Sequence, residues 1–405
     1  MLTDSPVDDL GDPVDPIEPI TPNLCLHQEA INYNESDEGN YGYCQFEACD
    51  NANYDEYSQY LEYQDYINSQ GGGEIIANSE LCQTSIGTPP TTAKIYLATN
   101  SGLSIYDGQT WSNLTSTDGL ASSTVNDVFV KDGVIYAATS SGLSISYDNG
   151  QSWNNYTVGE VGQVLVEDGI IYLTGMNLGR PFNSGLLISK DNGVSWVQHR
   201  GPGLHNQTGQ MSLKNGYITV TTWGGSVKHH PVNDNDPGVY HPPLSWNSAG
   251  LPPATSRMYF VNVTDSNRIL ASGCSYACGI YTIIPGVPGS YQNIRLDDGL
   301  ASNQVRKIFI KDDHIYAATS GGLSISNDDT HSWVNITADD GLRSNDLIEA
   351  YIGSDEVMYI ADRMGLSISY NGGSSWQTFD RDDGIGGPVA LESGVIVNGL
   401  FVQEP

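Results

Sequence analysis

The sequence predicts an all-β fold, a seven-bladed β-propeller of four-stranded blades, preceded by a small disulfide-rich module. The first observation is a unit of short runs rich in Val, Ile and Tyr, separated by Gly, Asn and Asp, from Val125 to Trp153. The second is that near-copies of this unit begin at Val305 and Asp355. The third is an aromatic position that recurs at intervals of 42, 43, 50, 45, 42 and 43 residues, a period typical of propeller blades. Its members are Trp111, Trp153, Trp196, Trp246, Tyr291, Trp333 and Trp376.

Charge in this chain is scarce and one-sided. Of its 405 residues 16% are charged, and 48 acidic against 16 basic side chains give a net charge of -32. We expect no nucleic-acid partner and no direct membrane insertion, because anionic surfaces would repel the protein and no apolar run approaches the ~18 residues that span a bilayer. No motif requires a cofactor, and the acidic loops leave Ca²⁺ binding open.

The N-terminal stretch MLTDSPVDDL has neither the basic nor the apolar region of a signal peptide. Two explanations compete: a cytosolic protein, or a mature secreted chain whose leader has been removed. The six cysteines, an even number, favour the second explanation, because disulfides persist outside the cytosol. We therefore expect a secreted, periplasmic or cell-surface-attached protein whose leader is absent from this sequence.

Composition divides the chain into four parts. Residues 1–24 mix Pro with Asp and Glu and are expected to form an acidic, extended linker. Residues 25–83 contain four of the six cysteines and form a small Cys-rich module. A second linker spans 84–90, and the propeller occupies 91–405, closed by the C-terminal strand.

The Cys-rich module contains two related stretches, CLHQEAINYN running to Cys44 and the shorter CDNANY from Cys49. They resemble the Cys-x4-Ala-x-Asn-Tyr-Asn repeats of surface proteins of marine bacteria, over about 60 residues. Four cysteines allow three pairings, and the resemblance favours Cys25–Cys44 and Cys49–Cys82, each closing one copy. The loop offers oxygen ligands for calcium, although a solvated loop closed by a disulfide is the favoured explanation. The candidate ligands are Asn34, Asp37, Glu38 and Asn40.

The closure of the ring is the least certain part of the predicted fold. The first blade lacks its own innermost strand, because Ile95 follows directly on a Pro- and Thr-rich linker. The stretch GPVALESG (387–394) is predicted to supply that strand from the C-terminus. VIVNGLFV (395–402) then resembles a second strand, a place that KIYLAT (94–99) already fills. It is expected to lie outside the ring, to cap an edge or to pair with another chain.

Four hairpins of the repeat carry the pattern Ser-x-Asp-x-Gly-x-Ser/Thr-Trp in whole or in part, as in SYDNGQSW (146–153). They resemble the Asp-box of sialidases, sortilin-type receptors, xyloglucanases and a photosystem assembly factor. In those families the hairpin lies on the face away from the ligand, which implies a structural role here: Asp bonds its own turn and Trp packs between blades. The structural residues are Asp148, Trp153, Asp191, Trp196, Asp328, Trp333 and Trp376.

A second signature precedes the innermost strands. DGLASSTVNDVFV (118–130) is echoed by DGLASNQVRKIFI (298–310) and DGLRSNDLIEAYI (340–352), and it resembles the propeller repeats in the periplasmic sensor domains of two-component regulators. The two signatures together cover about 310 residues. They imply a propeller, but unrelated activities share such repeats, so they do not fix a function.

Binding residues are expected where the repeat is broken, because loops on a rigid scaffold carry function. The departures concentrate in blades three to five, and counting strands places several of their loops on one face, here called the top face. An arginine-rich mouth there would suit a carboxylated or sulfated glycan, with aromatic residues as stacking platforms. The alternative is that these arginines pair with nearby aspartates. The candidates are Arg180, His205, Trp223, Arg257, Tyr276, Arg343 and Arg363.

Two further groups are weaker candidates. Cys274 and Cys278 flank a tight turn and are expected to form a disulfide there. The opposite, bottom face carries side chains of the types that bind transition metals, but their spacing matches no metal motif. These are His229, His230, Asp234, Asp236 and His241.

The sequence favours a non-catalytic, extracellular binding or scaffold propeller that recognises a glycan or a protein through top-face loops of blades three to five. The first alternative is a structural subunit of an extracellular assembly that self-associates through residues 1–83 or 395–402. The second is an Asp-box-type glycoside hydrolase. It is disfavoured because the Tyr–Glu arrangement and the arginine-containing N-terminal motif of sialidases cannot be found. The xyloglucanase type places two carboxylates in the cleft between two propellers, whereas this chain has one propeller.

Overall fold

The computed structural model describes most of the second half of the chain and parts of the first. By contacts the chain divides into two compact units, Met1–Gly87 and Thr88–Pro405. In the first unit only the backbone of β1 (Cys44–Ala48) and β2 (Gly73–Ala77), a parallel pair, is described, so the predicted disulfide module lies outside the described residues. In the second unit the described residues are 93–176, 178, 185–199, 208–222, 227–231, 244–245, 258–273, 278–284, 287, 290, 292–386 and 395–404.

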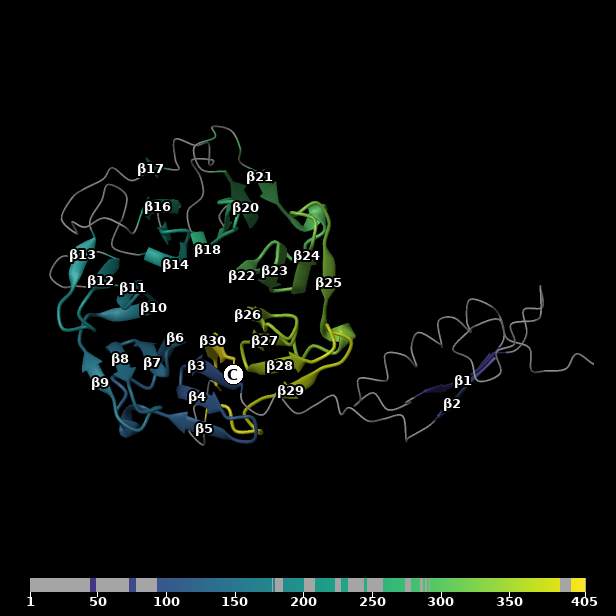
Figure 1. The fold of residues 1–405 in the computed structure, drawn as a ribbon, viewed down its shortest axis with the longest axis horizontal. Coiled ribbons are helices and arrows are strands. Elements are labelled where there is room, and N and C mark those ends of the chain that lie inside the picture. Colours follow the sequence, from purple (N-terminus) through teal and green to yellow (C-terminus); the bar gives the residue numbers. More distant parts are fainter. Residues whose placement is uncertain are drawn as a thin grey trace, which may run out of the picture. The chain divides into compact units, whose positions relative to one another are not determined.

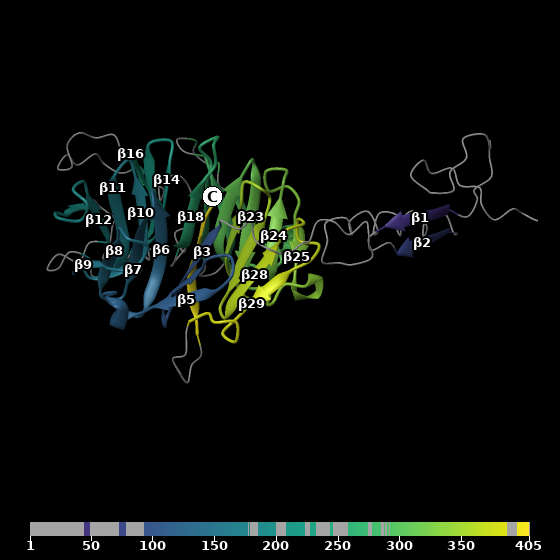
Figure 2. The same cartoon turned by 60° about the horizontal axis from the view of Figure 1, so that its bottom comes forward.

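The described strands of the second unit form seven four-stranded antiparallel sheets, arranged around a centre as the blades of a propeller (Figure 1). The prediction of an all-β propeller with four-stranded blades is confirmed. The innermost strands run along the propeller axis (Figure 2). They are β30 (Val397–Gln403), β6 (Val125–Lys131), β10 (Glu160–Glu167), β14 (Thr208–Lys214), β18 (Met258–Val263), β22 (Val305–Lys311) and β26 (Leu347–Ile352).

The remaining strands follow outward in the same order. The second strands are β3 (Lys94–Thr99), β7 (Val134–Thr139), β11 (Ile170–Met176), β15 (Tyr217–Thr222), β19 (Ile269–Gly273), β23 (His314–Thr319) and β27 (Met358–Asp362). The third are β4 (Gly102–Tyr106), β8 (Gly142–Ser146), β12 (Leu186–Ser189), β16 (Val227–Pro231), β20 (Gly279–Ile283), β24 (Gly322–Ser326) and β28 (Gly365–Ser369). The outer strands are β5 (Trp111–Leu114), β9 (Asn154–Tyr156), β13 (Val197–His199), β17 (Leu244–Ser245), β21 (Gln292–Ile294), β25 (Val334–Ile336) and β29 (Gln377–Phe379). We number the blades from the one that contains β3.

The first blade joins the two ends of the second unit. Its innermost strand is β30, which pairs antiparallel with β3 from Lys94↔Gln403 to Thr99↔Val397. The prediction that 395–402 is a surplus strand was therefore wrong, and the role assigned to 387–394, which lies outside the described residues, is taken by β30. The physical reason is the side-chain pattern: VNGLFVQ buries the same positions as VNDVFVK of β6, because both must pack against a neighbouring blade on each face.

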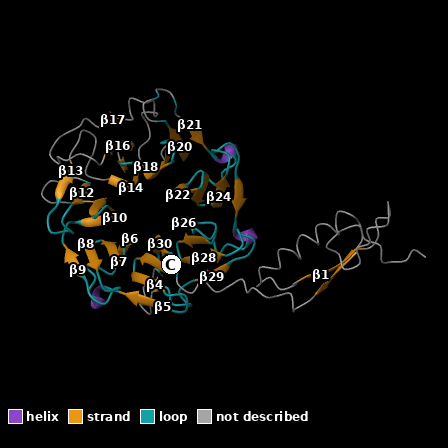
Figure 3. Cartoon of the chain, viewed as in Figure 1, coloured by secondary structure: helices purple, strands orange, loops and turns teal. Residues whose placement is uncertain are grey.

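The two repeated signatures stabilise the outer part of several blades. In the described part of the chain, three short 3-10 helices lie at the rim (Figure 3). They are η2 (Ser116–Asp118), η4 (Leu296–Asp298) and η5 (Ala338–Asp340). Each ends at a glycine of left-handed φ, for example Gly119 at 105°. A Cβ on Gly119 would lie 3.3 Å from the ring of Trp153 in the next hairpin. Glycine thus lets the tryptophan of one blade pack on the link that enters it.

Asparagine side chains tie the outer strands to the same links. The amide of Asn155 donates to the carbonyl of Gly119 at 2.8 Å and accepts from Ser144 Oγ at 2.7 Å. Asn113 and Asn335 make the corresponding bonds in their blades. The repeated Trp-x-Asn-x-Thr stretch is therefore explained by blade architecture, since its amide closes the corner between strand and link.

Candidate functional site

The Asp-box carboxylates on the bottom face are occupied within their own turns. Asp148 accepts hydrogen bonds from the backbone N–H and Oγ of Ser152 at 2.8 and 2.5 Å and from Ser146 Oγ at 2.8 Å, and Asp191 and Asp328 repeat the arrangement. Bonds from Ser332 lower the pKa of Asp328 to about 2. This geometry leaves the three carboxylates building turns rather than facing a ligand.

Arg343, a predicted top-face ligand, is only partly exposed and is paired with a buried carboxylate. Its guanidinium forms a two-pronged ion pair with Asp362, with Nε donating to Oδ2 at 2.8 Å and Nη2 bonding Oδ1. The Asp362 side chain is only 2% exposed and also accepts from the backbone N–H of Met364 at 2.7 Å. Arg343 thus follows the alternative stated above, an arginine that pairs with an aspartate.

Arg363, another predicted ligand, lines a top-face pocket of about 470 Å³ between blades five, six and seven. Its side chain is 52% exposed, and among the described residues only its Nε bonds a protein group, Asp346 Oδ2 at 2.9 Å. Arg306 binds the other oxygen of Asp346 at 2.6 Å and donates to the carbonyl of Leu347 at 3.2 Å. One carboxylate therefore holds two guanidinium groups side by side at the pocket.

The other walls of this pocket are polar or aromatic. Tyr259, at the start of β18, is 46% exposed, and Gly273, Asn303 and Gln304 complete the lining with Val305. Arg306 was not among the predicted residues because it lies within a strand instead of a loop. The sequence does carry one signal, a polar residue at the second position of VNDVFVK, VNGLFVQ and VRKIFIK. In β6 and β30 these residues are Asn126 and Asn398, and their amides also donate to the next blade.

Of the remaining predicted site residues, the structure describes a few, and the others lie outside the described residues. His229 and His230 lie on β16; His229 is buried, stacks on Tyr217 with ring centroids 4.4 Å apart, and its Nδ1 hydrogen-bonds Thr219 Oγ1 at 2.8 Å. The described residues hold no group of three His, Cys, Asp or Glu side chains placed to bind a metal. Cys278 is disulfide-bonded. The predicted residues outside the described ranges are Arg180, His205, Trp223, Arg257, Tyr276, Cys274, Asp234, Asp236, His241, Asn34, Asp37, Glu38 and Asn40.

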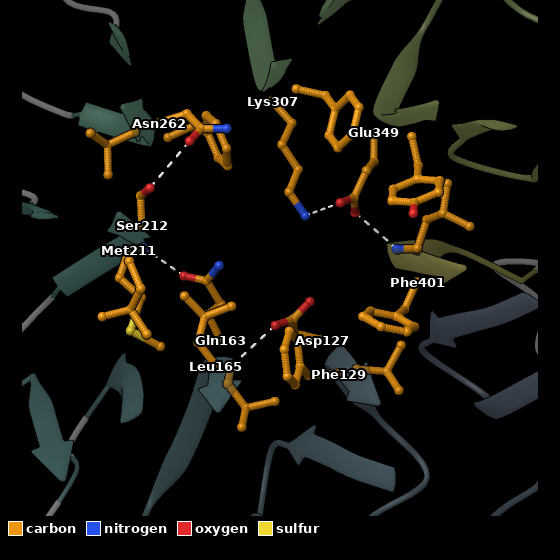
Figure 4. A pocket seen from close by; sticks show the side chains of 18 of the residues that line it. Asp127, Phe129, Gln163, Leu165, Met211, Ser212, Asn262, Lys307, Glu349 and Phe401 are labelled. Carbon is orange, nitrogen blue, oxygen red and sulfur yellow. Dashed lines mark hydrogen bonds and ion pairs between the residues drawn. The ribbon is translucent and has the colours of Figure 1, made fainter. Parts of the chain in front are cut away.

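A second cavity, of about 320 Å³, lies at the propeller centre (Figure 4). Its lining comes from the innermost strands of all seven blades. Each of these strands carries a register shift near its start, as between Val125 and Asp127, and such irregularities re-aim side chains. Just after the shift stand Asp127, Gln163, Lys307 and Glu349.

These four side chains form a polar ring that also connects neighbouring blades. Asp127 Oδ2 accepts from Val164 N at 3.1 Å, Gln163 Oε1 accepts from Met211 N at 2.5 Å, and Glu349 Oε2 accepts from Leu400 N at 2.9 Å. Lys307 forms an ion pair with Glu349 across the cavity wall, as Figure 4 shows. None of these four residues is indicated by the sequence, because within a strand they resemble ordinary polar alternation.

Asp127 has the strongest electrostatic perturbation in this ring. Burial raises the pKa of its carboxyl from 3.8 to about 7; Lys307 opposes the shift, whereas the charge of Glu349 adds to it. Its side chain is 7% exposed. A carboxyl that titrates near neutrality is thus held in the wall of the central cavity.

The described geometry defines an all-β propeller with one arginine-lined pocket on its top face and one mixed polar and aromatic cavity at its centre. No protein-family model matches the chain, and no curated protein matches it. The part of the chain that the structure describes contains no helix long and apolar enough to cross a membrane.

Solved structures share the fold at low sequence identity. PorZ, a surface component of the type-IX secretion system of Porphyromonas gingivalis, is similar with a TM-score of 0.53 and 16% identity over 66% of this chain and 42% of that one. The present chain thus spans about two fifths of PorZ. The computationally designed protein Ika8 is similar with a TM-score of 0.50 and 12% identity, over 74% of this chain and 90% of that one.

An extracellular domain of a two-component system also appears among the similar structures. It is that of BT3049 from B. thetaiotaomicron, with a TM-score of 0.41 and 17% identity, over 69% of this chain and 44% of that one. At these identities the likenesses concern the fold alone.

Proposed function

We propose that this protein is an extracellular or cell-surface, non-catalytic binding propeller that recognises acidic groups of a glycan or of a partner protein through its top face. The observation that carries the proposal is the pair Arg306 and Arg363, held by the single carboxylate of Asp346 at a pocket of about 470 Å³. Two guanidinium groups against one carboxylate leave a local positive charge, although the whole chain carries -32.

The donor geometry supports an anionic ligand group. Arg363 uses Nε on Asp346, and in the described residues its two terminal nitrogens have no protein partner. Such a fork donates two parallel hydrogen bonds to a carboxylate or sulfate. Tyr259 offers an exposed aromatic face beside it, the kind of surface on which a sugar ring or an aromatic side chain packs. The described lining of this pocket contains no carboxylate that would serve as a catalytic acid or base.

The proposal is tested by binding to an array of carboxylated, sulfated and neutral oligosaccharides, with acidic peptides as a second arm. We expect retention of acidic ligands, which weakens with salt because the contact is ionic. Arg363→Ala should abolish retention. The matched control is Arg381→Ala, which removes an exposed arginine of the same charge from a link outside the pocket. Equal retention by the two variants, or no retention of any acidic ligand, would refute the proposal.

A further inference from the structure

The central cavity has the features of a ligand site that is independent of the top face. Eighteen of its lining side chains surround a common space in Figure 4, and the labelled polar groups come from six different blades. Its volume of about 320 Å³ lies at the lower end of the range of small-molecule sites. A mostly apolar cavity with a few convergent polar groups, one of them with a shifted pKa, is the arrangement expected of a binding site.

The polar groups offer both donors and acceptors to the cavity. Gln163 uses its Oε1 on Met211, and its Nε2 has no protein partner in the described residues. The Lys307 ammonium pairs with Glu349 and has three protons to donate. Acceptors are the carboxyl groups of Asp127 and Glu349 and the hydroxyl of Ser212, which itself donates to Asn262 at 3.1 Å. A ligand that fits must therefore accept and donate hydrogen bonds.

A second set of side chains gives the cavity aromatic walls. On each innermost strand, the residue two positions after the polar-ring position also lines the cavity in five blades. These residues are Phe129, Leu165, Phe309, Tyr351 and Phe401, so Leu165 takes the place of an aromatic residue in blade three. Phe129 and Phe401 meet edge to face, with ring centroids 5.3 Å apart. Flat apolar faces beside hydrogen-bonding groups suit a ring whose faces are apolar and whose rim is polar.

The polar ring carries no uncompensated charge below pH 7. Lys307 and Glu349 form an ion pair, and burial raises the pKa of Asp127 to about 7, so its carboxyl is protonated and neutral below that pH. A charged ligand would therefore lose its hydration without gaining a countercharge in the cavity, whereas a neutral ligand avoids this cost.

We propose that the central cavity binds a neutral, hydroxyl-rich ring, a monosaccharide, which hydrogen-bonds Gln163, Lys307 and Asp127 and packs its apolar face on Phe129 and Phe401. This site is separate from the arginine pocket, so the two proposals stand or fall independently.

The test is isothermal titration of the full chain with a panel of neutral monosaccharides and with uronic acids and amino sugars. We expect at least one neutral sugar to bind with one site per chain. Phe129→Leu and Phe401→Leu should weaken it roughly threefold to tenfold, because each removes an aromatic face. Leucine is compatible with the fold there, since Leu165 occupies the equivalent position in blade three.

Controls separate this site from other effects. Phe379→Leu makes the same exchange in a cluster outside the cavity and should leave binding unchanged, as should Arg363→Ala in the top pocket. Gln163→Glu keeps the acceptor for Met211 but removes the donor and adds charge, and should weaken binding further. The proposal is overturned if no neutral sugar binds at millimolar concentration, if only charged sugars bind, or if binding persists unchanged in the two leucine variants.

Discussion

Replacing Asp127 by Asn should stabilise the protein above neutral pH. The carboxyl has a folded pKa of about 7 against an ordinary value of 3.8, so between these values the unfolded chain ionises while the folded chain stays protonated. The contribution of the protonated Asp127 carboxyl to stability is therefore fully present below pH 3.8 and is lost as the pH rises toward 7. At about 1.4 kcal/mol per pH unit, the loss amounts to about 4 kcal/mol. Asn does not titrate and still offers an oxygen to Val164 N.

Urea unfolding followed by tryptophan fluorescence, at pH 4.5 and at pH 8, measures this effect. The advantage of Asp127→Asn over the parent protein should be small at pH 4.5 and grow to a few kcal/mol at pH 8. The matched control is Asp148→Asn, because Asn371 already fills that role in the seventh-blade hairpin, accepting from Ser375 N at 2.9 Å; its effect should not grow over this range. A pH-independent difference for Asp127→Asn would show that burial does not hold this carboxyl protonated.

Three further predictions follow from packing and backbone geometry. Thr330 has a φ of 75° where the other hairpins carry glycine. Thr330→Gly should therefore raise the free energy of unfolding by about 1 kcal/mol, and Gly150→Thr should lower it. Changes of the opposite sign would contradict the strain argument. Arg343→Ala should lower the free energy of unfolding by about 3 kcal/mol, because it leaves Asp362 buried and unpaired. Adding Asp362→Asn should restore part of this stability. If the double variant restores none, the cause is not electrostatic. Removal of 397–405 strips β3 of its partner and should abolish cooperative thermal unfolding of the propeller, whereas removal of 1–87, a separate compact unit, should leave it cooperative.

The aromatic repeat and the alternation of each strand were sufficient to predict the propeller, because a blade is a local object. In every blade except the first the four strands are consecutive in sequence, and a hairpin such as SYDNGQSW carries its own turn residues. The hydrogen bonds of Asp148, Asp191 and Asp328 are equally local, since their partners lie within four residues.

Contacts between blades were not predictable in this way. The sequence pattern placed Arg343 and Arg363 on the same face, yet Arg343 pairs with the buried Asp362 whereas Arg363 lines a pocket. Arg306 lies within a strand, and its partner Asp346 belongs to the next blade, 40 residues later, so its place beside Arg363 could not be predicted. The closing strand was misplaced because KIYLAT and VNGLFVQ are separated by almost the whole propeller.

By itself, the sequence determined the class of fold, the position of the blades and the structural role of the repeated Asp and Trp residues, since these depend on short-range periodicity and turn chemistry. Only the tertiary structure decided which strand closes the ring and which polar side chains meet at its centre. Asp127, Gln163, Lys307 and Glu349 converge because ring closure brings one position of each blade to a common axis. No local pattern records that convergence, as each residue contributes a single polar side chain to an otherwise ordinary strand.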